Sequence, residues 1–372
     1  MSILNRKNIL LGISGGIAAY KSAFLVRLLV KNGANVQVIM TPNAKDFVTP
    51  LTLSTLSKRT VLSDFFNKEN QNELWNNHVE LALWADYIVI APATANTLSK
   101  MASASADNLL IATYLSAKCP VYFAPAMDLD MHRNKANKLN INKLINFGNI
   151  HIPVNSGFLA SGLEGEGRMQ EPNQIMEFIS TNILKEMKLF GKKILITAGP
   201  TYEPIDAVRF IGNFSSGKMG FALAETAAKL GAEVFLVTGP TNLTIDSERI
   251  KSFYITSADE MFKITNELFL NMDMAILSAA VSDFKPKKMV QKKIKKENND
   301  NLIIDLVSNI DILNHLGKIK KKNQLLIGFA LEFENEIENA IKKINKKNLD
   351  AIVLNSLRDK GAGFKHDTNK IT

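Results

Sequence analysis

The sequence predicts an α/β protein made of two doubly wound, Rossmann-like domains. Both halves of the chain repeat one order of elements: a short apolar strand, a loop, a helix, a Gly-Ala turn and a second apolar strand. These strands are expected at residues 8–14 and 36–40 in the first half and at residues 193–197 and 234–238 in the second. A polar helical stretch separates the halves, so we expect domains at residues 1–190 and 191–372.

The composition is that of an ordinary globular α/β protein. Its 372 residues can form two full-sized cores, and 46% of them are hydrophobic while 22% are charged. No apolar run reaches the roughly 18 residues of a membrane span, and the first residues read as a short strand rather than a signal peptide. We therefore expect a cytoplasmic protein that has no membrane partner.

Cysteine, histidine and charge content narrow the functional classes further. The single cysteine, Cys119, excludes an internal disulfide, and we expect this side chain to be packed. The five histidines lie far apart, without the spacing of a zinc site. The formal net charge of +9 could indicate nucleic-acid binding, but the lysines are scattered among asparagines and no nucleic-acid motif is present. We expect no nucleic-acid partner, because small phosphorylated substrates or codon-driven lysine enrichment explain the charge equally well.

Polar groups gather where the first strand of the second half ends. The loop that follows residues 193–197 carries Thr201, Asp206, Arg209 and Asn213, and a helical pattern comes after it. In open α/β sheets this is the place where anionic ligands bind, because free backbone N–H groups and a helix N-terminus point at the ligand. The sequence therefore predicts an anion-binding site here.

The same segment contains part of a P-loop, Gly212-x4-Gly217-Lys218. A complete P-loop also needs Ser or Thr after the Lys and an apolar strand directly before the first Gly. Met219 stands at the hydroxyl position, and the preceding residues AVRFI make a poor strand. A P-loop-like NTPase is therefore the weaker interpretation, and an ordinary strand-to-helix connection is a third.

The first half has a similar polar edge. Gly15 and Gly16 precede a helix, where small residues let the backbone approach a phosphate. A second buried strand, residues 86–91, is followed by hydroxyl and amide side chains in residues 92–97. The small residues of 101–108 leave room for a flat ring close to the chain. Such an edge fits a ligand site, although a satisfied helix cap has the same composition.

These segments resemble a known family. The stretch ITAGPTYEPIDAVRFIGNFSSGKMG resembles the signature of phosphopantothenate–cysteine ligase, which in bacteria is usually fused behind a flavin-dependent phosphopantothenoylcysteine decarboxylase. SGGIAAYK, APATANTLSKMA, ADNLL and PAM are similar to the FMN-binding decarboxylases. The resemblance implies a bifunctional coenzyme A biosynthesis protein with an N-terminal FMN domain and a C-terminal ligase domain. It also implies phosphopantothenate, cysteine, CTP and phosphopantothenoylcysteine as partners, and assembly as a homo-oligomer.

For the decarboxylase half the resemblance implies three groups of residues. His78 matches the active-site histidine, although a lone histidine after a polar run is otherwise a surface residue. Asn108, Met127 and Asp128 fall on the substrate site. The FMN would be surrounded by Ser14, Gly15, Thr41, Thr94, Asn96 and Thr97.

Two of these positions depart from the family pattern. Asp128 replaces the asparagine that engages the substrate carboxylate, so two like charges would meet. Ser161 stands at the position of the catalytic cysteine, whose thiol is far more easily ionised than a hydroxyl. We therefore expect that the domain folds and binds FMN but completes decarboxylation slowly or not at all. A non-catalytic flavoprotein scaffold is the corresponding alternative.

For the ligase half the resemblance points to a mobile cation. Seven lysines crowd residues 285–296, which without a family would read as a solvated basic run. Lys293 matches the essential lysine of a loop that closes over CTP, where it stabilises the charge of an acyl-cytidylate-forming step together with Mg²⁺. Asn213 matches the residue that handles the acyl intermediate, and Arg209 the residue that binds phosphopantothenate. The CTP site would comprise Leu277, Ser278, Ala279, Asp283, Ile310, Asp311, Ile312, Leu313, Phe329, Lys343 and Lys347. The resemblance does not identify Mg²⁺ ligands.

Overall fold

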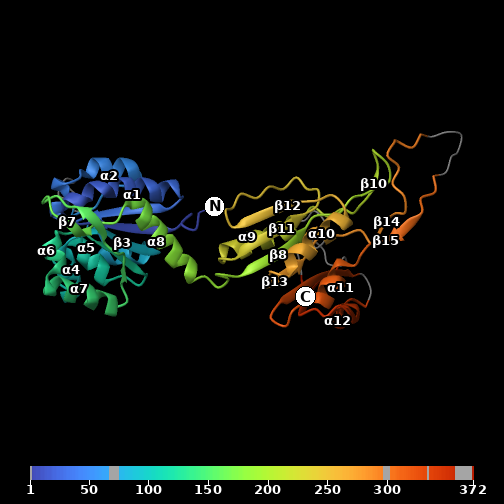
Figure 1. The fold of residues 1–372 in the computed structure, drawn as a ribbon. Helices are drawn as coiled ribbons and strands as arrows, with labels where there is room; N and C mark the ends of the chain where they lie inside the picture. The colour runs from blue at the N-terminus through green and yellow to red at the C-terminus, as the bar shows by residue number, and fades with distance from the viewer. Residues whose placement is uncertain (1, 67–74, 296–301, 333–334, 357–370) are drawn as a thin grey trace. The chain divides into compact units, whose positions relative to one another are not determined.

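The computed structural model describes residues 2–66, 75–295, 302–332, 335–356 and 371–372 (Figure 1). The chain forms two compact units, Met1–Ile183 and Leu184–Thr372. The division lies slightly before the expected boundary at 190/191. Leu189 explains the difference, because its side chain packs against the core of the second unit and its N–H donates to the Leu230 carbonyl oxygen at 2.9 Å.

The first unit is built on a parallel five-stranded sheet with the strand order β2-β1-β3-β4-β5. The strands are β1 (Asn8–Ile13), β2 (Asn35–Met40), β3 (Tyr87–Ala93), β4 (Val121–Pro125) and β5 (Ile150–His151). Nearly all residues of β1 to β4 are buried, which fits the continuous apolar runs seen in the sequence. The order reverses between β1 and β3, and the carboxyl ends of the strands at this point form the expected ligand crevice.

Helices cover both faces of this sheet, with α1 and α2 on one side and α4, α5 and α7 on the other (Figure 1). The helix expected after Gly15 and Gly16 begins with a 3-10 turn, and a hairpin of β6 and β7 follows the sheet. The elements are η1 (Ile17–Ala19), α1 (Tyr20–Lys31), η2 (Pro42–Asp46), α2 (Pro50–Ser57), α3 (His78–Trp84), α4 (Ala95–Ser103), α5 (Leu109–Leu115), α6 (Leu129–Arg133), α7 (Lys135–Asn146), β6 (Asn155–Phe158), β7 (Glu164–Arg168) and α8 (Pro172–Lys185).

The second unit is built on a parallel six-stranded sheet with the strand order β12-β11-β8-β13-β16-β17. The strands are β8 (Lys193–Ala198), β11 (Glu233–Thr238), β12 (Ile250–Tyr254), β13 (Met274–Leu277), β16 (Leu325–Glu332) and β17 (Ala351–Ser356). Numbered along the chain, this is the order 3-2-1-4-5-6 of a Rossmann fold. The expected fold class, two doubly wound α/β domains, is confirmed.

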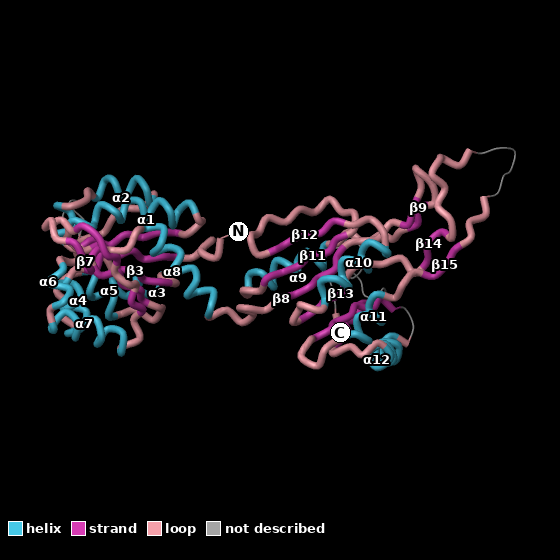
Figure 2. The backbone as a smooth tube through the Cα atoms, viewed as in Figure 1, coloured by secondary structure: helices cyan, strands magenta, loops and turns pink. Residues whose placement is uncertain are grey.

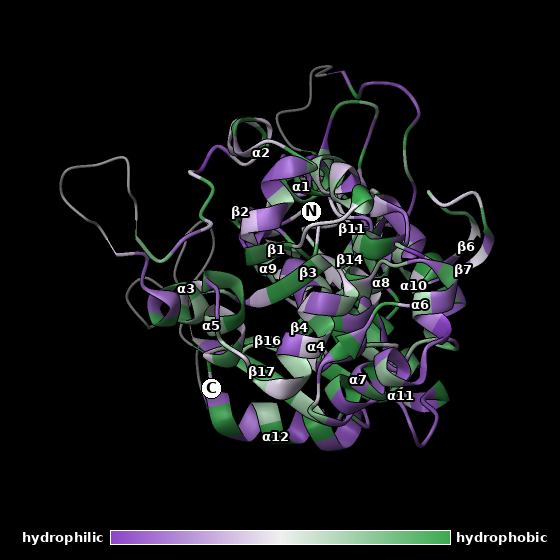
Figure 3. Cartoon of the chain, turned by 90° about the vertical axis from the view of Figure 1, so that its left-hand side faces the viewer, coloured by the Kyte–Doolittle hydropathy of each residue, from purple (hydrophilic) through white to green (hydrophobic). Residues whose placement is uncertain are grey.

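The described residues of this unit form four helices beside the sheet: α9 (Lys218–Lys229), α10 (Ala258–Phe269), α11 (Ile312–Ile319) and α12 (Glu336–Lys346). Helix α12 carries both hydrophobic and hydrophilic residues, as expected for a helix with one face on a sheet (Figure 3). Two short antiparallel pairs lie beyond the sheet, and β14 lies beside β9 (Figure 2). They are β9 (Glu203–Pro204) with β10 (Phe210–Ile211), and β14 (Phe284–Pro286) with β15 (Leu306–Ser308).

The connection from β8 to α9 in the second unit differs from a P-loop. Strand β8 ends at Ala198, and Gly212 follows the two-residue antiparallel strand β10 instead of a parallel strand of the sheet. The Gly212–Lys218 stretch therefore lacks the strand that a P-loop requires in front of it. The helix begins at Lys218, slightly earlier than its apolar pattern, with Gly217 as its N-cap at a φ of 79°.

Two features of the whole chain bear on its class. Within the described residues, every helix is too short or too polar to cross a lipid bilayer. Cys119 is half-buried against the core of the first unit, as expected, and burial is the main cause that raises the pKa of its thiol. A thiol with a raised pKa forms little thiolate at neutral pH and is correspondingly unreactive.

Replacing Gly239 with Ala is expected to destabilise the second unit. A Cβ at Gly239 would lie 1.7 Å from the Pro200 carbonyl oxygen, so the backbones that follow β11 and β8 would have to separate. Such a backbone shift costs about 2–4 kcal/mol of unfolding free energy. Urea denaturation followed by circular dichroism measures this loss.

The two tryptophans provide the control for this substitution. Both Trp75 and Trp84 belong to the first unit, so their fluorescence follows the unfolding of that unit alone. We expect the fluorescence transition to stay where it is in the wild type. If the circular-dichroism transition of Gly239→Ala is also unchanged, the loops after β8 and β11 move apart without a loss of unfolding free energy, which would contradict this prediction.

Candidate functional site

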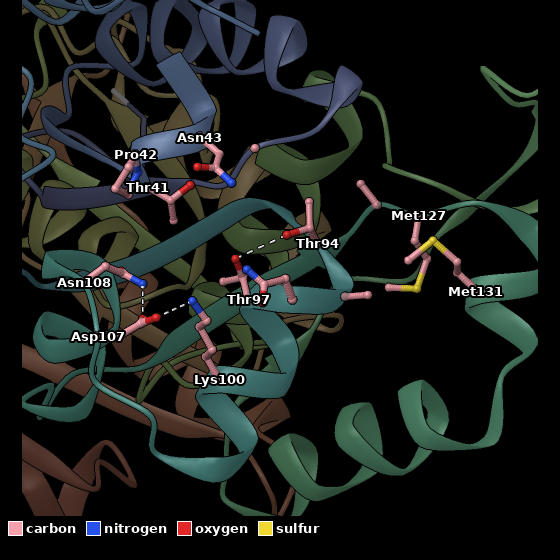
Figure 4. Close-up of a pocket in the computed structure, with 14 residues that line it drawn as sticks. Thr41, Pro42, Asn43, Thr94, Thr97, Lys100, Asp107, Asn108, Met127 and Met131 are labelled. Atoms are coloured by element: carbon pink, nitrogen blue, oxygen red, sulfur yellow. Dashed lines mark hydrogen bonds and ion pairs between the residues drawn. The ribbon is translucent and has the colours of Figure 1, made fainter. Parts of the chain in front are cut away.

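The first unit contains a cavity of about 470 Å³ at the carboxyl edge of its sheet (Figure 4). Each of the strands β1 to β4 is followed by a residue that lines this cavity. The structure thus brings together most of the residues expected around FMN and its substrate, namely Gly15, Thr41, Thr94, Asn96, Thr97, Asn108 and Met127.

Ser14, the remaining residue expected at FMN, is buried behind the cavity. Its hydroxyl donates to the Pro92 carbonyl oxygen at 2.7 Å and accepts from the Thr94 N–H at 3.0 Å. These two bonds tie the end of β1 to the end of β3. Ser14 therefore positions Thr94, which lines the cavity, and is not itself among the residues that line it.

The shape and chemistry of the cavity fit a flavin nucleotide. A Cβ on Gly15 would lie 2.9 Å from the backbone of Asn43, so only glycine lets these two loops form one wall. Figure 4 shows Lys100, Asp107 and Asn108 at one side of the cavity and the sulfur atoms of two methionines at the other. Hydroxyls, amides and an ammonium group suit the ribityl chain and phosphate of FMN, while methionine suits an aromatic ring.

Sequence reasoning missed Asn43, Lys100 and Asp107. Lys100 and Asp107 form an ion pair at 2.5 Å, and the hydrogen bond from Lys100 is the main cause that lowers the pKa of Asp107. Both residues lie inside segments quoted for the family resemblance, but their side chains meet only because α4 and the loop before α5 pack together. Asn43 follows Thr41 by two positions and could have been found from that neighbourhood.

A second cavity of about 440 Å³ shares Ala126 and Met127 with the first. Asp128 lines it, together with Phe158 of β6 and Arg168 of β7. The Asp128 carboxylate accepts from the Leu129 N–H at 2.6 Å and caps helix α6. The structure thus supplies a hydrogen-bond donor to the carboxylate that replaces the asparagine of the family.

Ser161 lies in the turn between β6 and β7, where it is exposed. The preceding residue, Ala160, lines the second cavity, so the turn reaches its rim. Strand β7 of this hairpin is fixed to the residues after β4 by one hydrogen bond: the Met127 N–H donates to the Gly167 carbonyl oxygen at 3.0 Å. The backbone therefore places the serine on a hairpin that borders the expected substrate site.

A buried lysine supports the same wall. Lys21 of α1 is 5% exposed and donates to Glu171 at 2.8 Å and to the Met169 carbonyl oxygen at 3.2 Å. Arg168 donates to the same Glu171 oxygen at 2.8 Å. The bond from Lys21 is the main cause that lowers the pKa of Glu171. These two cations were not predicted from the sequence.

His78 does not line either cavity within this chain. It is the first residue of α3, and its ring makes edge contacts with Phe65 and Trp75 at centroid distances of 6.3 Å and 5.9 Å. Its buried Nδ1 atom has no hydrogen-bond partner among the residues that the structure describes. The structure thus separates this residue from the other residues expected at the decarboxylase site.

In the second unit, the ends of the neighbouring strands β8 and β13 meet. The Asn213 amide donates to the Ala280 carbonyl oxygen at 2.6 Å. Ser278 donates to the Thr197 carbonyl oxygen at 2.6 Å, and the Ala279 N–H donates to the Thr197 hydroxyl at 3.1 Å. Asn213, Ser278 and Ala279 therefore lie at one place, as the ligase resemblance implies.

Hydrogen bonds continue from this place toward α11. The Thr201 hydroxyl accepts from the Ser282 N–H at 3.0 Å, and the Asn309 amide donates to the Ser282 carbonyl oxygen at 2.8 Å. The Asn309 N–H also donates to the Asp283 carbonyl oxygen at 2.8 Å, while the Asp283 side chain is exposed. This network joins the β13 loop to Asp311, two residues beyond Asn309.

Asp311 and Lys347 form an ion pair at 2.8 Å. Asp311 is the N-cap of α11, and Lys347 follows directly after α12. The neighbouring residues play different parts: Ile310 is exposed, whereas Ile312 is buried and Leu313 packs against the core. We therefore attribute a packing role to Ile312 and Leu313 beside any contact of their backbone with a nucleotide.

Four further expected residues lie on separate elements of this unit. Leu277 ends β13 and pairs with Gly328 of β16, the residue before Phe329. Lys343 lies on α12, where its side chain is half-buried. Lys293 lies in the described part of the lysine-rich loop and is exposed.

Arg209 is joined to that loop through Asp206. The Arg209 guanidinium donates to Asp206 at 2.7 Å, and the N–H of Ile294, the residue after Lys293, donates to the same Asp206 oxygen at 3.1 Å. Arg209 and the backbone beside Lys293 are thus neighbours in space. Asp206 was noted in the sequence only as one polar residue of the loop.

Replacing Asp311 with Asn should lower stability at neutral pH only. Burial opposes ionisation of Asp311, but the hydrogen bonds from Lys347 and from the Asn314 N–H outweigh it, so the pKa of the carboxyl is lowered. A lowered folded-state pKa stabilises the fold above the ordinary value of about 3.9, and this contribution is lost as the pH falls through the folded-state pKa. Asparagine keeps the helix cap and removes only the charge.

The pair is partly exposed, so the expected loss of unfolding free energy at pH 7 is about 0.5–1 kcal/mol. Chemical denaturation of wild type and variant at pH 7 and pH 3 measures it. The difference should shrink as the pH falls to 3, because the unfolded state then binds a proton at this carboxyl, whereas the lowered pKa of the folded state opposes protonation. An equal difference at both pH values would assign the effect to the helix cap.

Comparison with known proteins gives a match for each unit. Residues 2–184 match the family model named Flavoprotein, and residues 189–372 match the model of the DNA/pantothenate metabolism flavoprotein C-terminal domain. A solved C-terminal domain of coenzyme A biosynthesis bifunctional protein CoaBC is 47% identical and covers 44% of this chain and 77% of that chain, with a TM-score of 0.40. A solved PPC decarboxylase mutant complexed with pantothenoylaminoethenethiol is 31% identical and covers 48% of this chain and 99% of that chain, with a TM-score of 0.44.

Two curated relatives match almost the whole chain. A protein of an unknown prokaryotic organism, named cysteine/cysteine sulfinic acid decarboxylase, is 54% identical over 329 residues, which are 87% of this chain and 91% of that protein. The coenzyme A biosynthesis bifunctional protein CoaBC of Bacillus subtilis (strain 168) is 44% identical over 372 residues, which are 100% of this chain and 91% of that protein. Relatives of the same name occur in Borreliella burgdorferi and Haemophilus influenzae at 44% and 41% identity. The chain therefore belongs to the family of bifunctional coenzyme A biosynthesis proteins.

Proposed function

We propose that the chain catalyses two successive steps of coenzyme A biosynthesis. The second unit couples 4′-phosphopantothenate to cysteine at the expense of CTP, and the first unit decarboxylates the resulting phosphopantothenoylcysteine with FMN. The observation that carries the ligase proposal is the junction of β8 and β13, which gathers Asn213, Ser278 and Ala279. In the same unit, Arg209 and the backbone N–H of Ile294, the residue after Lys293, both donate to Asp206.

The proposed ligase step places negative charge where the second unit offers cations. Attack of a carboxylate on the α-phosphate of CTP gives an acyl-cytidylate and pyrophosphate, and the cysteine amine then displaces the nucleotide. Lys293 is exposed and free to reach a nucleotide, while Arg209 is held by Asp206. Cations placed beside a phosphoryl group, whether held in advance like Arg209 or brought in by a long side chain like Lys293, stabilise the charge that develops on it.

Mg²⁺ would enter this site with the nucleotide. Among the described residues, no three His, Cys, Asp or Glu side chains lie close enough to hold a metal ion. Magnesium is commonly bound through substrate phosphates and one or two carboxylates, which needs no such cluster. Asp283, exposed beside the β13 loop, is the carboxylate that we propose for this contact.

For the first unit we propose that Thr41, Thr94, Thr97 and Lys100 hold FMN in the larger cavity, and that the substrate occupies the smaller one. Bound FMN supplies the oxidising power for this reaction. The chain itself binds the substrate between Met127 and the β6–β7 hairpin and shields it from water. We also propose a homo-oligomeric assembly, which the family resemblance implies.

Decarboxylation of free cysteine or cysteine sulfinic acid is the second candidate. It is favoured by the 54% identical relative that carries this name. That relative aligns over 329 residues and so also matches the second unit, which means that the activity in its name does not exclude a ligase step. The strand junction that gathers Asn213, Ser278 and Ala279 supports a ligase in this unit. We therefore rank this activity below the two steps proposed above.

One set of assays separates these functions. Pyrophosphate release is measured with CTP, ATP or GTP, each with and without phosphopantothenate and cysteine, and the visible spectrum records bound flavin. We expect release that requires CTP, phosphopantothenate and cysteine together. Nucleotide hydrolysis without phosphopantothenate would indicate an NTPase, and flavin without any turnover would indicate a scaffold. Release of CO₂ from free cysteine at the rate seen with phosphopantothenoylcysteine would favour the second candidate.

A further inference from the structure

Asp206 is a fully buried carboxylate in the turn between β9 and β10, with a side-chain exposure of 0%. One of its oxygens accepts from the Val208 and Arg209 N–H groups at 2.7 Å and 2.8 Å. The other accepts from the Arg209 guanidinium at 2.7 Å and from the Ile294 N–H at 3.1 Å. The carboxylate thus receives four hydrogen bonds from three residues.

The bond from Ile294 crosses 88 positions of sequence. It is reinforced nearby by the Val290 N–H, which donates to the Ile205 carbonyl oxygen at 3.1 Å. The described part of the lysine-rich loop is therefore fixed to the β9–β10 turn at two points. Lys293 directly precedes the second point, so the turn fixes its backbone while its side chain stays exposed.

The site requires a charged acceptor. Four N–H groups converge on two oxygens, and an asparagine in the same place would turn an NH₂ group toward some of these donors. Burial opposes ionisation of Asp206, but the hydrogen bonds from Val208, Ile294 and Arg209 outweigh it, so the pKa of the carboxyl is lowered. Asp206 is thus the negative partner of Arg209.

We propose that Asp206 is the positioning residue of the ligase site. It orients the Arg209 guanidinium and, through Ile294, fixes the backbone beside Lys293, so that both cations are presented to one bound substrate complex. Asp206 itself contacts neither substrate. The effect of Asp206 on catalysis rests on the proposed ligase function. The anchoring of the loop depends only on the hydrogen bonds described above.

Limited trypsin digestion of the unliganded protein tests the anchoring without any activity measurement. In Asp206→Asn we expect cleavage after Lys292, Lys293 and Lys295, measured by mass spectrometry, to be at least about threefold faster than in the wild type, because loop opening governs cleavage. Asp259→Asn is the matched control. It removes the exposed ion pair between Asp259 and Lys285 of β14 and should leave these cleavage rates unchanged.

Steady-state pyrophosphate release then tests the positioning. A displacement of about 1 Å of a group that acts on the substrate lowers the rate roughly 10- to 100-fold. We therefore expect kcat of Asp206→Asn to fall by that factor, while KM for cysteine changes little. Asp206→Glu, which keeps the charge, should recover part of the loss. A merely structural role would instead lower the melting temperature and leave kcat of the folded fraction unchanged.

Ile294→Pro provides a second variant if the buried substitution prevents folding. It removes the N–H that donates to Asp206, and it also replaces the half-buried isoleucine side chain and fixes the φ angle at this position. Faster cleavage after Lys292 and Lys295, with lower kcat, supports the proposal. Unchanged cleavage in both variants overturns it, even if the wild type is an active ligase. If both variants are cleaved faster but the wild type itself releases no pyrophosphate, the proposed ligase function is wrong and the anchoring of the loop is still supported.

Discussion

Replacing Lys293 with Gln is expected to lower pyrophosphate release by at least about a hundredfold, the loss typical of removing one group that stabilises transition-state charge. Glutamine keeps most of the length and hydrogen-bonding ability of the side chain but none of its positive charge. The fold should be unaffected, because Lys293 is exposed and its neighbour Ile294 keeps the bond to Asp206. Steady-state assays with CTP, phosphopantothenate and cysteine measure the effect.

Lys292→Gln is the matched control, since Lys292 is the preceding residue and is also exposed. It removes the same charge from the same loop and should change the rate less than about twofold, as expected for a screened surface charge. Equal losses in both variants would mean that the loop acts only through its total charge. A Lys293→Gln enzyme with near wild-type turnover would remove this residue from the mechanism.

Replacing Ser161 with Cys is expected to raise the rate of phosphopantothenoylcysteine decarboxylation by at least about tenfold, within the range of one general acid or base. A thiol with a pKa near 8.5 donates a proton or forms a thiolate at neutral pH, and a serine hydroxyl does neither. Ser161 lies in the turn of a hairpin whose residues line the second cavity. The added thiol would therefore lie at the rim of the proposed substrate site. Release of CO₂ by the FMN-loaded protein measures the rate.

Ser156→Cys controls for the thiol itself. Ser156 lies on β6 of the same hairpin and is exposed, but it is not among the residues that line the cavity. This variant should decarboxylate at the wild-type rate, and both variants should keep the wild-type flavin spectrum. If the wild type already matches Ser161→Cys, a different group supplies the proton and our interpretation of this position is wrong.

The architecture could be read from the sequence because its signals are local. Buried parallel strands such as β1 and β8 are continuous apolar runs, and each lies within a residue of its expected bounds. Residues directly after such strands, Gly15 and Thr94 among them, were also predictable, because the carboxyl ends of parallel strands meet at one edge. The pairs β9–β10 and β14–β15 were not, since strands of two or three residues are too short to show a period.

The sites were predictable only in part, because contacts between residues far apart in the sequence leave no local pattern. The family resemblance suggests roles for Arg209 and Lys293, but no pattern shows that they meet, because their link passes through a side chain and an N–H that are 88 positions apart. Lys100 and Asp107 escaped notice since their pairing depends on how α4 packs. His78 is the opposite case: the resemblance gives it a role at the active site, but it is not among the residues that line the two cavities of the first unit described above.

The only native thiol gives the chain a practical property. Cys119 is half-buried and its pKa is raised, so it should react slowly with maleimides. A thiol introduced at position 161 would be exposed and would be the faster of two targets. A fluorophore could then be attached to the hairpin tip without first removing the natural cysteine, and its emission would report in real time when a ligand reaches the adjoining cavity.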